Sequence, residues 1–302
     1  MISSARAWVL ILLLTLAPAC AARDDGRAHI VVTTNILGDL TRAVVGDSAE
    51  VTVLMPPNAD PHQFAISART AARIERADLL VHNGLGLEEG IRRHIRSAED
   101  AGVATLAVGE RVDPIAYRGL ERGGPDPHFW TDPVRAQRAV QTIGDRIAGI
   151  PGVDANAVRA NTSRYLAELR GLTDWMTERF AAVPAERRKL VTNHHVFGYL
   201  AQRFGFEVIG AVVPSGTTLA SPSAADLAEL AETVRAAGVP AIFADASQPD
   251  RLARVLAEQA GLRIRVIGLY SESLTAADGG APTYAAMMRA DTEAVVGGLM
   301  TS

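Results

Sequence analysis

Cysteine and lysine are almost absent from this chain of 302 residues. Cys20 is the only cysteine and Lys189 the only lysine. A single cysteine excludes an internal disulfide. The chain is 48% hydrophobic, and at this length it can bury a sizeable core, either as one large domain or as two of moderate size.

An excess of positive charge is also missing. The formal net charge is -4 and the pI is about 6.0, so nothing in the composition indicates a nucleic-acid partner. The chain also lacks a Gly-x-Ser-x-Gly elbow, a P-loop and a dinucleotide fingerprint, and the glycines of "NGLGLEEG" (83–90) have the wrong spacing. No motif therefore supports an enzyme. A Ser-His-Asp enzyme stays an alternative, because single residues alone do not exclude one.

Long apolar runs are confined to the N-terminus. Arg6 is followed by "AWVLILLLTLAPA" (7–19) and then by Cys20. This pattern predicts a secretory signal over residues 1–20, since a membrane-spanning helix needs about 20 apolar residues. The position of Cys20 after "APA" resembles a lipoprotein signal, in which the cysteine carries a lipid anchor. Pro18 departs from the usual pattern, so the alternatives are cleavage without lipidation and an uncleaved anchor. We expect an exported protein, periplasmic or at the cell surface.

Strand and helix patterns alternate along the rest of the chain. "HIVVTTN" (29–35) predicts a buried strand, "ILGDLTRAVVG" (36–46) a helix that ends at Gly46, and "AEVTVLMPP" (49–57) a second strand. The same order of helix, glycine, strand and proline recurs in residues 197–214. The alternation indicates mainly parallel sheets, and the recurrence indicates two similar α/β lobes.

A long amphipathic helix separates the two halves. Residues 154–184 contain no internal proline, and their apolar positions are spaced by three, four and seven residues. Such a helix would be about 40 Å long, which makes it a stiff strut. The predicted fold is therefore α/β, with two similar lobes of mainly parallel sheets flanked by helices and joined by one long rigid helix. The predicted segments are the signal (1–20), the N-terminal lobe (28–150), the linking helix (151–184) and the C-terminal lobe (185–302).

The tripeptide Asp-Pro-His occurs twice, at residues 60–62 and 126–128. Proline fixes its own φ and restricts the residue before it, so His62 and His128 are presented from stiffened loops. Such loops favour metal ligation, and the preceding acids, Asp60 and Asp126, are placed to orient the imidazoles. The alternative is two unrelated turns, each with a surface histidine.

His194 and His195 lie side by side in "VTNHHVFGYL" (191–200), directly after a predicted strand. Ligands gather at the carboxyl ends of strands in open α/β sheets. Consecutive side chains diverge by roughly 100° or more, so we expect one metal ion to bind only one of the two. The alternative is a histidine pair at a helix start that packs or caps.

Two acids at predicted strand ends could supply a carboxylate ligand. Asp245 ends the strand pattern "AIFAD" (241–245), and Glu272 follows "RVIGLY" (265–270). Helix capping is the alternative role for either acid. The residues alone do not choose between Asp245 and Glu272.

Several stretches of the chain resemble one known family. "PPNADPHQF", "DLLVHNGLGLEEG", "DPHFWTDP", "NHHVFGYLAQRFGFEVIG" and "TYAAMMRADTEAVVGGL" are similar, in this order, to the zinc- and manganese-binding solute-binding proteins of bacterial ABC importers, the ZnuA/TroA-like group. The resemblance extends from about residue 28 to residue 300. It implies two α/β lobes bridged by a long helix, with a metal ion bound between the lobes.

The resemblance also implies a ligand set. The family's three imidazole or imidazole-equivalent positions fall on His62, His128 and His194, and its usual aspartate is matched by Glu272. His195 then becomes a neighbour of the site, as do Asp60, Asp126 and Asp245. Three histidines and one carboxylate suit Zn²⁺ better than Mn²⁺. The segment "YRGLERGGPDPH" contains no histidine-rich loop before His128.

The resulting functional prediction is a monomeric, non-enzymatic binding protein. It would capture Zn²⁺, or less favourably Mn²⁺, outside the cytoplasm and deliver it to an ABC permease. The main alternative is a zinc hydrolase with three histidine ligands and an open water position. Glu272 discriminates between them, because as a fourth ligand it closes the site. A structural or adhesive role is a third, more distant hypothesis.

Overall fold

The structure is a computed structural model that describes residues 26–117, 123–261 and 264–300. The predicted signal segment, including Cys20, lies outside these residues. Among the helices that the structure describes, none is both long enough and apolar enough to cross a membrane.

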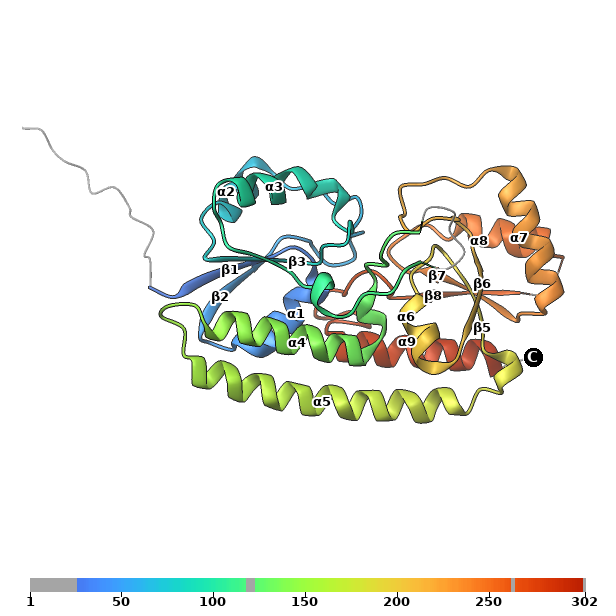
Figure 1. Cartoon of the computed structure of the whole chain (residues 1–302). Coiled ribbons are helices and arrows are strands. Elements are labelled where there is room, and N and C mark those ends of the chain that lie inside the picture. Colours follow the sequence, from blue (N-terminus) through green and yellow to red (C-terminus); the bar gives the residue numbers. More distant parts are fainter. Residues whose placement is uncertain (1–25, 118–122, 262–263, 301–302) are drawn as a thin grey trace, which may run out of the picture.

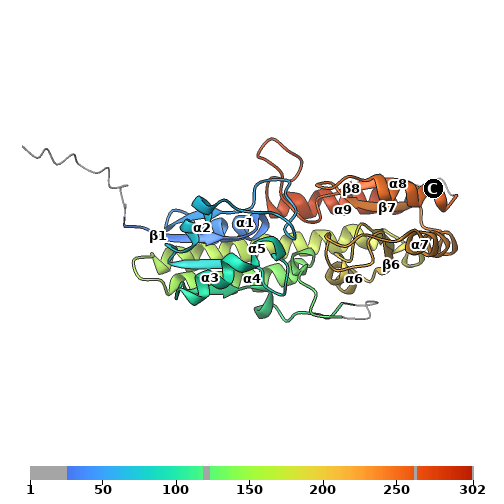
Figure 2. The same cartoon turned by 90° about the horizontal axis from the view of Figure 1, so that it is seen from above.

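Two lobes lie end to end, each built on one sheet (Figures 1 and 2). The strands of the N-terminal lobe are β1 (Ala28–Val32), β2 (Ala49–Val53), β3 (Leu79–His82) and β4 (Thr105–Ala107). Its helices are α1 (Asn35–Val45), α2 (Ala68–Ile74), α3 (Arg92–Asp100) and α4 (Pro133–Ala148). The strands of the C-terminal lobe are β5 (Lys189–Thr192), β6 (Glu207–Ala211), β7 (Ala241–Asp245) and β8 (Arg265–Leu269). Its helices are α6 (Gly198–Phe204), α7 (Ala224–Ala237), α8 (Arg251–Gln259) and α9 (Tyr284–Met300).

Both sheets have the same topology. The strand orders are β2-β1-β3-β4 and β6-β5-β7-β8, and all the strand pairs are parallel. The two halves of the chain thus repeat one arrangement, and the predicted α/β class with two similar lobes is confirmed. Because parallel strands are covered by helices on both faces, their sequences are continuous apolar runs, such as "AIFAD" in β7, which is buried throughout.

Local sequence signals explain where α1 begins and ends. The Thr34 side chain accepts a hydrogen bond from the Leu37 N–H at 3.3 Å, which caps the first turn. The helix ends at Gly46, whose φ of 55° lies in the left-handed region that favours glycine. This is the end predicted from the sequence.

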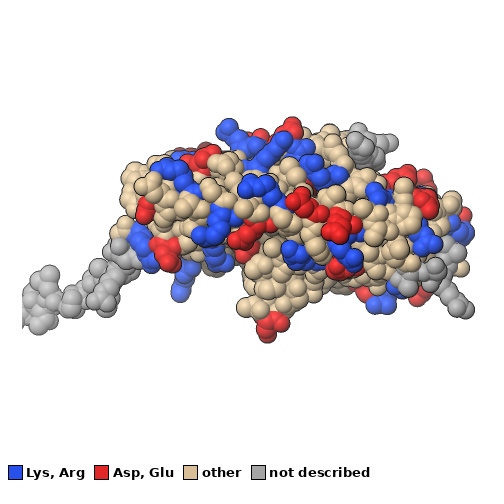
Figure 3. Space-filling model, turned by 90° about the horizontal axis from the view of Figure 1, so that it is seen from below, with Lys and Arg blue, Asp and Glu red and all other residues tan. Residues whose placement is uncertain are grey.

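The predicted long helix is α5 (Ala155–Ala181), which has 27 residues and runs beneath both lobes (Figure 1). Asp154 accepts hydrogen bonds from the backbone N–H groups of Asn156 and Ala157 and caps its start. At about 1.5 Å per residue the helix is about 40 Å long. Its outer face carries charged side chains of both signs, and Figure 3 shows them intermingled on the underside of the molecule.

The two lobes share one hydrophobic core below the sheets. A single buried cluster contains Ile30 of the first sheet, Leu169 of α5 and Phe243 of the second sheet. Helix α5 packs against α1, α4 and α9 in this layer. Separate smaller clusters fill the opposite faces, under α2 and α3 in one lobe and under α7 and α8 in the other. The lobes are therefore held by continuous packing in addition to the chain that connects them.

Phe180, near the end of α5, provides a test of this packing. Its ring is 1% exposed, and its centroid lies 4.8 Å from that of Phe204 and 5.0 Å from that of Phe206. We expect Phe180→Ala to lower the free energy of unfolding by about 3–5 kcal/mol, measured by urea denaturation of the metal-free protein. The matched control is Leu252→Ala, because Leu252 is 38% exposed. Equal losses in the two variants would contradict a shared core at Phe180.

Candidate metal centre

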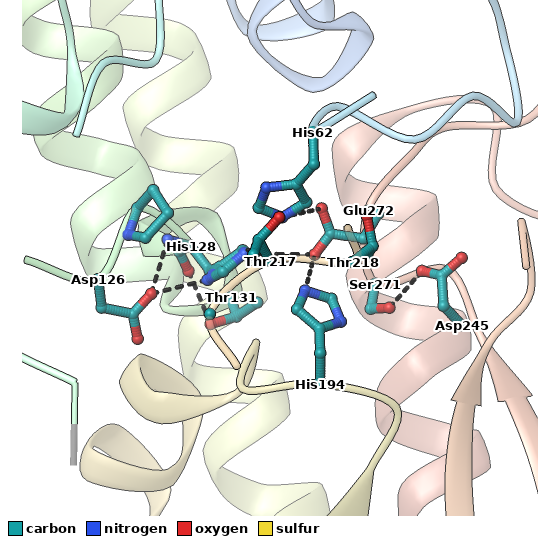
Figure 4. Close-up of polar contacts among 12 residues, drawn as sticks. His62, Asp126, His128, Thr131, His194, Thr217, Thr218, Asp245, Ser271 and Glu272 are labelled. Atoms are coloured by element: carbon teal, nitrogen blue, oxygen red, sulfur yellow. Dashed lines mark hydrogen bonds and ion pairs between the residues drawn. The ribbon is translucent and has the colours of Figure 1, made fainter. Parts of the chain in front are cut away.

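Three histidines and one glutamate meet between the two lobes (Figure 4). His62 lies in the loop after β2, and His128 lies just before a short 3-10 turn, Phe129–Thr131. His194 follows β5, and Glu272 follows β8. One nitrogen or oxygen of each side chain lies within 4.8 Å of the others, and all four side chains are buried. The loops that follow the parallel strands thus place these groups where the two sheets face each other.

The distances within this cluster are short. Oε1 of Glu272 lies 3.2 Å from Nε2 of His194 and 3.6 Å from Nε2 of His128. Oε2 of Glu272 is 3.9 Å from Nε2 of His62, and the Nε2 atoms of His62 and His128 are 3.3 Å apart. A tetrahedral zinc ion with bonds of about 2.0 Å has ligand atoms roughly 3.3 Å apart. The four separations given above are close to this spacing, so the cluster is near the size that a four-coordinate ion requires.

Burial determines the protonation of the cluster. It lowers the pKa of His62, with the Glu272 charge acting in the opposite direction, and it lowers the pKa of His128 well below the ordinary value. It lowers the pKa of His194 to about 4. The same desolvation raises the pKa of Glu272 well above its ordinary value. The imidazoles are thus neutral at physiological pH, which is the form that binds metal.

Several atoms of the cluster lack hydrogen-bond partners among the described residues. Both carboxylate oxygens of Glu272 and both ring nitrogens of His194 are buried without a hydrogen bond of acceptable geometry. A buried polar atom that makes no hydrogen bond costs about 1–3 kcal/mol. Such groups are rare in folded proteins and indicate a site that is completed by an ion or another ligand.

Asp126 has the arrangement proposed for the acid in an Asp-Pro-His tripeptide. Its Oδ1 accepts a hydrogen bond from the His128 backbone N–H at 2.9 Å and lies 2.8 Å from Nδ1 of His128. With a proton on Nδ1, the lone pair of Nε2 faces the cluster. Burial raises the pKa of Asp126 to about 8, while the hydrogen bond from the His128 backbone acts in the opposite direction.

Asp60 does not have this arrangement. Its Oδ1 accepts from the backbone N–H of His62 at 2.8 Å, but its carboxylate makes no hydrogen bond to the ring. The acid beside Nδ1 of His62 is instead Glu89, whose Oε1 is 3.6 Å away. The same tripeptide therefore places its acid differently relative to the histidine ring in the two loops.

His195 and Asp245 both lie outside the four-residue cluster. The side chain of His195 lines a cavity of about 770 Å³ that also borders Tyr117 and Asp126. Asp245 accepts a hydrogen bond from the Ser271 hydroxyl at 2.5 Å and one from the Ser247 backbone N–H at 2.7 Å. Glu272 is thus the acid that faces the histidines, and Asp245 supports the turn after β7 and the residue next to Glu272.

Uncharged residues that the sequence analysis does not single out also hold the loops of the cluster. Asn83 donates from its side chain to the Pro127 carbonyl at 3.0 Å, just before His128. Trp130 donates from Nε1 to the Ser271 carbonyl at 2.9 Å, just before Glu272. Both residues lie in stretches with a family resemblance, "DLLVHNGLGLEEG" and "DPHFWTDP". That resemblance was the only signal for them, because neither side chain is a metal ligand.

Comparison with known proteins identifies the family of this chain. The sequence profile of the family described as zinc-uptake complex component A, periplasmic (ZnuA), matches residues 30–298. The chain belongs to this family. The resemblance noted in the sequence is thereby confirmed, and the match includes all four residues of the cluster.

The names of three relatives of similar sequence refer to three different metals. The manganese-binding lipoprotein MntA of Halalkalibacterium halodurans is 25% identical over 298 residues, which cover 97% of each chain. The zinc-binding protein TroA of Treponema pallidum is 29% identical over 287 residues, or 92% of this chain and 91% of TroA. The iron-binding protein YfeA of Yersinia pestis is 26% identical and covers 91% of this chain and 88% of its own. The solved structure of TroA matches with a TM-score of 0.84 at 26% identity, covering 91% of this chain and 100% of that structure.

The raised pKa of Glu272 leads to a test on the metal-free protein. The folded protein holds the Glu272 proton more tightly than the unfolded chain does, for which the ordinary value is 4.5. This stabilisation is present below the ordinary value and is lost as the pH rises toward the raised pKa. Gln imitates the protonated acid. Metal-free Glu272→Gln should therefore become increasingly more stable than the wild type as the pH rises from about 5 to about 8.

Urea denaturation at several pH values measures this difference. Glu50→Gln is the matched control, since Glu50 is exposed on β2. A difference between Glu272→Gln and the wild type that stayed constant with pH would contradict the protonated, buried state of Glu272.

Proposed function

We propose that this protein captures Zn²⁺, in preference to Mn²⁺, outside the cytoplasm and delivers it to an ABC permease. The observation that carries the proposal is the buried cluster of His62, His128, His194 and Glu272. We propose that these four side chains are the metal ligands. Membership of the ZnuA family supports a role in metal binding and transport.

The choice of Zn²⁺ rests on the ligand set. The names of the relatives refer to manganese, zinc and iron, so they do not select one metal. Imidazole suits zinc, whereas manganese favours carboxylate, carbonyl and water oxygens. Three neutral imidazoles and one carboxylate, at distances that fit a tetrahedral ion, therefore favour Zn²⁺.

The position of Glu272 argues against the hydrolase alternative. A catalytic zinc ion keeps one coordination position open for water. Glu272 approaches all three histidines within 3.9 Å, so it would occupy that position as the fourth ligand. We therefore assign the cluster to capture of the metal as cargo, with no catalytic step.

Location and partners follow from the proposed transport role. The predicted signal at 1–20 and the description of the family as periplasmic support export. The name of MntA includes the word lipoprotein, which supports a lipid anchor at Cys20. The partners we propose are the metal ion, the permease and the membrane through this anchor. We propose a monomer, and the net charge of -4 gives no reason to add a nucleic-acid partner.

The metal preference has a direct test. The purified mature protein should bind one Zn²⁺ tightly and Mn²⁺ more weakly, because imidazole ligands and the general order of divalent affinities both favour zinc. Competition titration against a chelator of known affinity measures both constants. Equal affinity for the two ions would contradict the proposed preference.

The ligand assignment is tested with three variants in one titration series. His194→Ala removes a proposed zinc bond and should weaken Zn²⁺ binding severely. The adjacent His195→Ala is the matched control, and its loss should not exceed the roughly 10–100-fold typical of residues that only support a ligand. Glu272→Gln should fall between them, since a neutral amide is a poorer zinc ligand. A larger loss in His195→Ala than in His194→Ala would show that the wrong histidine was assigned.

A further inference from the structure

Glu272 belongs to the C-terminal lobe in sequence, but its loop is fixed to the N-terminal lobe. The Asn35 side chain donates to the Ser273 hydroxyl at 2.8 Å and accepts from the Leu274 backbone N–H at 2.9 Å. Trp130 reaches the carbonyl of Ser271 on the other side of Glu272. The Glu272 loop is thus tied to the N-terminal lobe as well as to its own lobe, where the Ser271 hydroxyl donates to Asp245.

The backbone of the segment that carries His194 is hydrogen-bonded within the C-terminal lobe. The backbone N–H of His195 donates to the Ser215 carbonyl at 3.1 Å, and that of Val213 donates to the Asn193 carbonyl at 2.8 Å. His194 is therefore coupled to residues 213–219, the segment after β6. The position of His194 relative to the other ligands therefore depends on what holds this segment, together with the start of α6, against the N-terminal lobe.

Asp60 makes that connection beside the site. Its carboxylate is 5% exposed. Its Oδ1 accepts from the His62 backbone, while its Oδ2 accepts from the Thr218 hydroxyl at 2.5 Å and from the Gln248 side chain at 3.1 Å. One carboxylate thus joins the loop of one proposed ligand to two segments of the opposite lobe. Two further links lie nearby: the Tyr117 hydroxyl donates to the Gly216 carbonyl at 2.9 Å, and the Tyr199 hydroxyl of α6 donates to the Asp126 carbonyl at 2.7 Å.

We infer that Asp60 is a positioning residue that retains the bound metal by holding the 213–219 segment, and with it His194, against the His62 loop. The inference rests on the proposed function. Hydrogen bonds to a carboxylate are stronger than neutral ones, and here they are shielded from water. Loss of the bonds to Asp60 Oδ2 should loosen the 213–219 segment and with it His194, so the metal should dissociate faster, while the bond from the His62 backbone to Asp60 Oδ1 is kept.

The test removes the cross-lobe bonds and leaves the bond from Asp60 to the His62 backbone in place. Thr218→Val replaces the hydroxyl with a methyl group, and Gln248→Met removes the amide at similar length. Zinc-loaded protein is mixed with excess chelator, and the release of Zn²⁺ is followed by stopped flow. We expect the double variant to release Zn²⁺ about 10-fold faster than the wild type, at the lower end of the effect of residues that orient ligands.

Two controls separate positioning from general destabilisation. Thr218→Ser keeps the hydroxyl and should release Zn²⁺ at the wild-type rate, which a role of Thr218 in packing alone would not predict. Thr177→Val makes the same change on the exposed face of α5 and should have no effect. If the double variant does not fold, Thr218→Val alone should still release the metal faster than Thr218→Ser.

Release from the double variant at the wild-type rate would overturn the inference, as would equal acceleration in Thr218→Val and Thr218→Ser. The proposed function is contradicted by a different result, namely that the wild-type protein binds neither Zn²⁺ nor Mn²⁺. The two failures are therefore distinguishable within the same set of measurements.

Discussion

The burial of three imidazoles and one carboxylate against one another is the constraint on which the rest of the structure depends. His62, His128, His194 and Glu272 are all at most 1% exposed, and several of their polar atoms have no hydrogen-bond partner among the described residues. Bringing these groups together removes them from water, which disfavours their charged forms. This desolvation lowers the pKa values of the histidines and raises the pKa of Glu272. A divalent cation bonded to all four groups, as we propose, would offset this cost.

The fold keeps these groups together through a shared core. Helix α5 and the hydrophobic layer that runs beneath both sheets fix the two lobes relative to each other. Hydrogen bonds from Asn35 and Trp130 then attach the Glu272 loop to the opposite lobe. Ligands that are already positioned lose less conformational entropy on binding, so this rigidity favours tight capture of a small ion.

Much of the fold could be predicted because its signals are local. The apolar runs of β1 and β7, the glycine at the end of α1 and the spacing along α5 each follow from neighbours within a few residues. Helix α4 was not predicted from the sequence, although Asp132 and Pro133 form a typical helix start. Asp132 accepts a hydrogen bond from the Val134 N–H, and proline occupies the first turn. The strand β4 was also not assigned, because it has only three residues.

The four residues that the structure brings together were predicted from the sequence, whereas the contacts that support them were less predictable. The two Asp-Pro-His tripeptides have the same sequence, yet only Asp126 reaches the ring of its histidine. Asp60 instead contacts Thr218, which is 158 positions away along the chain. Contacts of this kind depend on how the two lobes are placed relative to each other, and no local pattern in the sequence contains that information.

X-ray absorption spectroscopy at the zinc edge of the zinc-loaded protein tests the central claim most directly. The account predicts a four-coordinate ion with three histidine nitrogens and one carboxylate oxygen, at about 2.0–2.2 Å, and no bound water. A shell with fewer than three imidazoles, or with five or six oxygen-rich ligands, would contradict the assignment of His62, His128, His194 and Glu272 as the metal site.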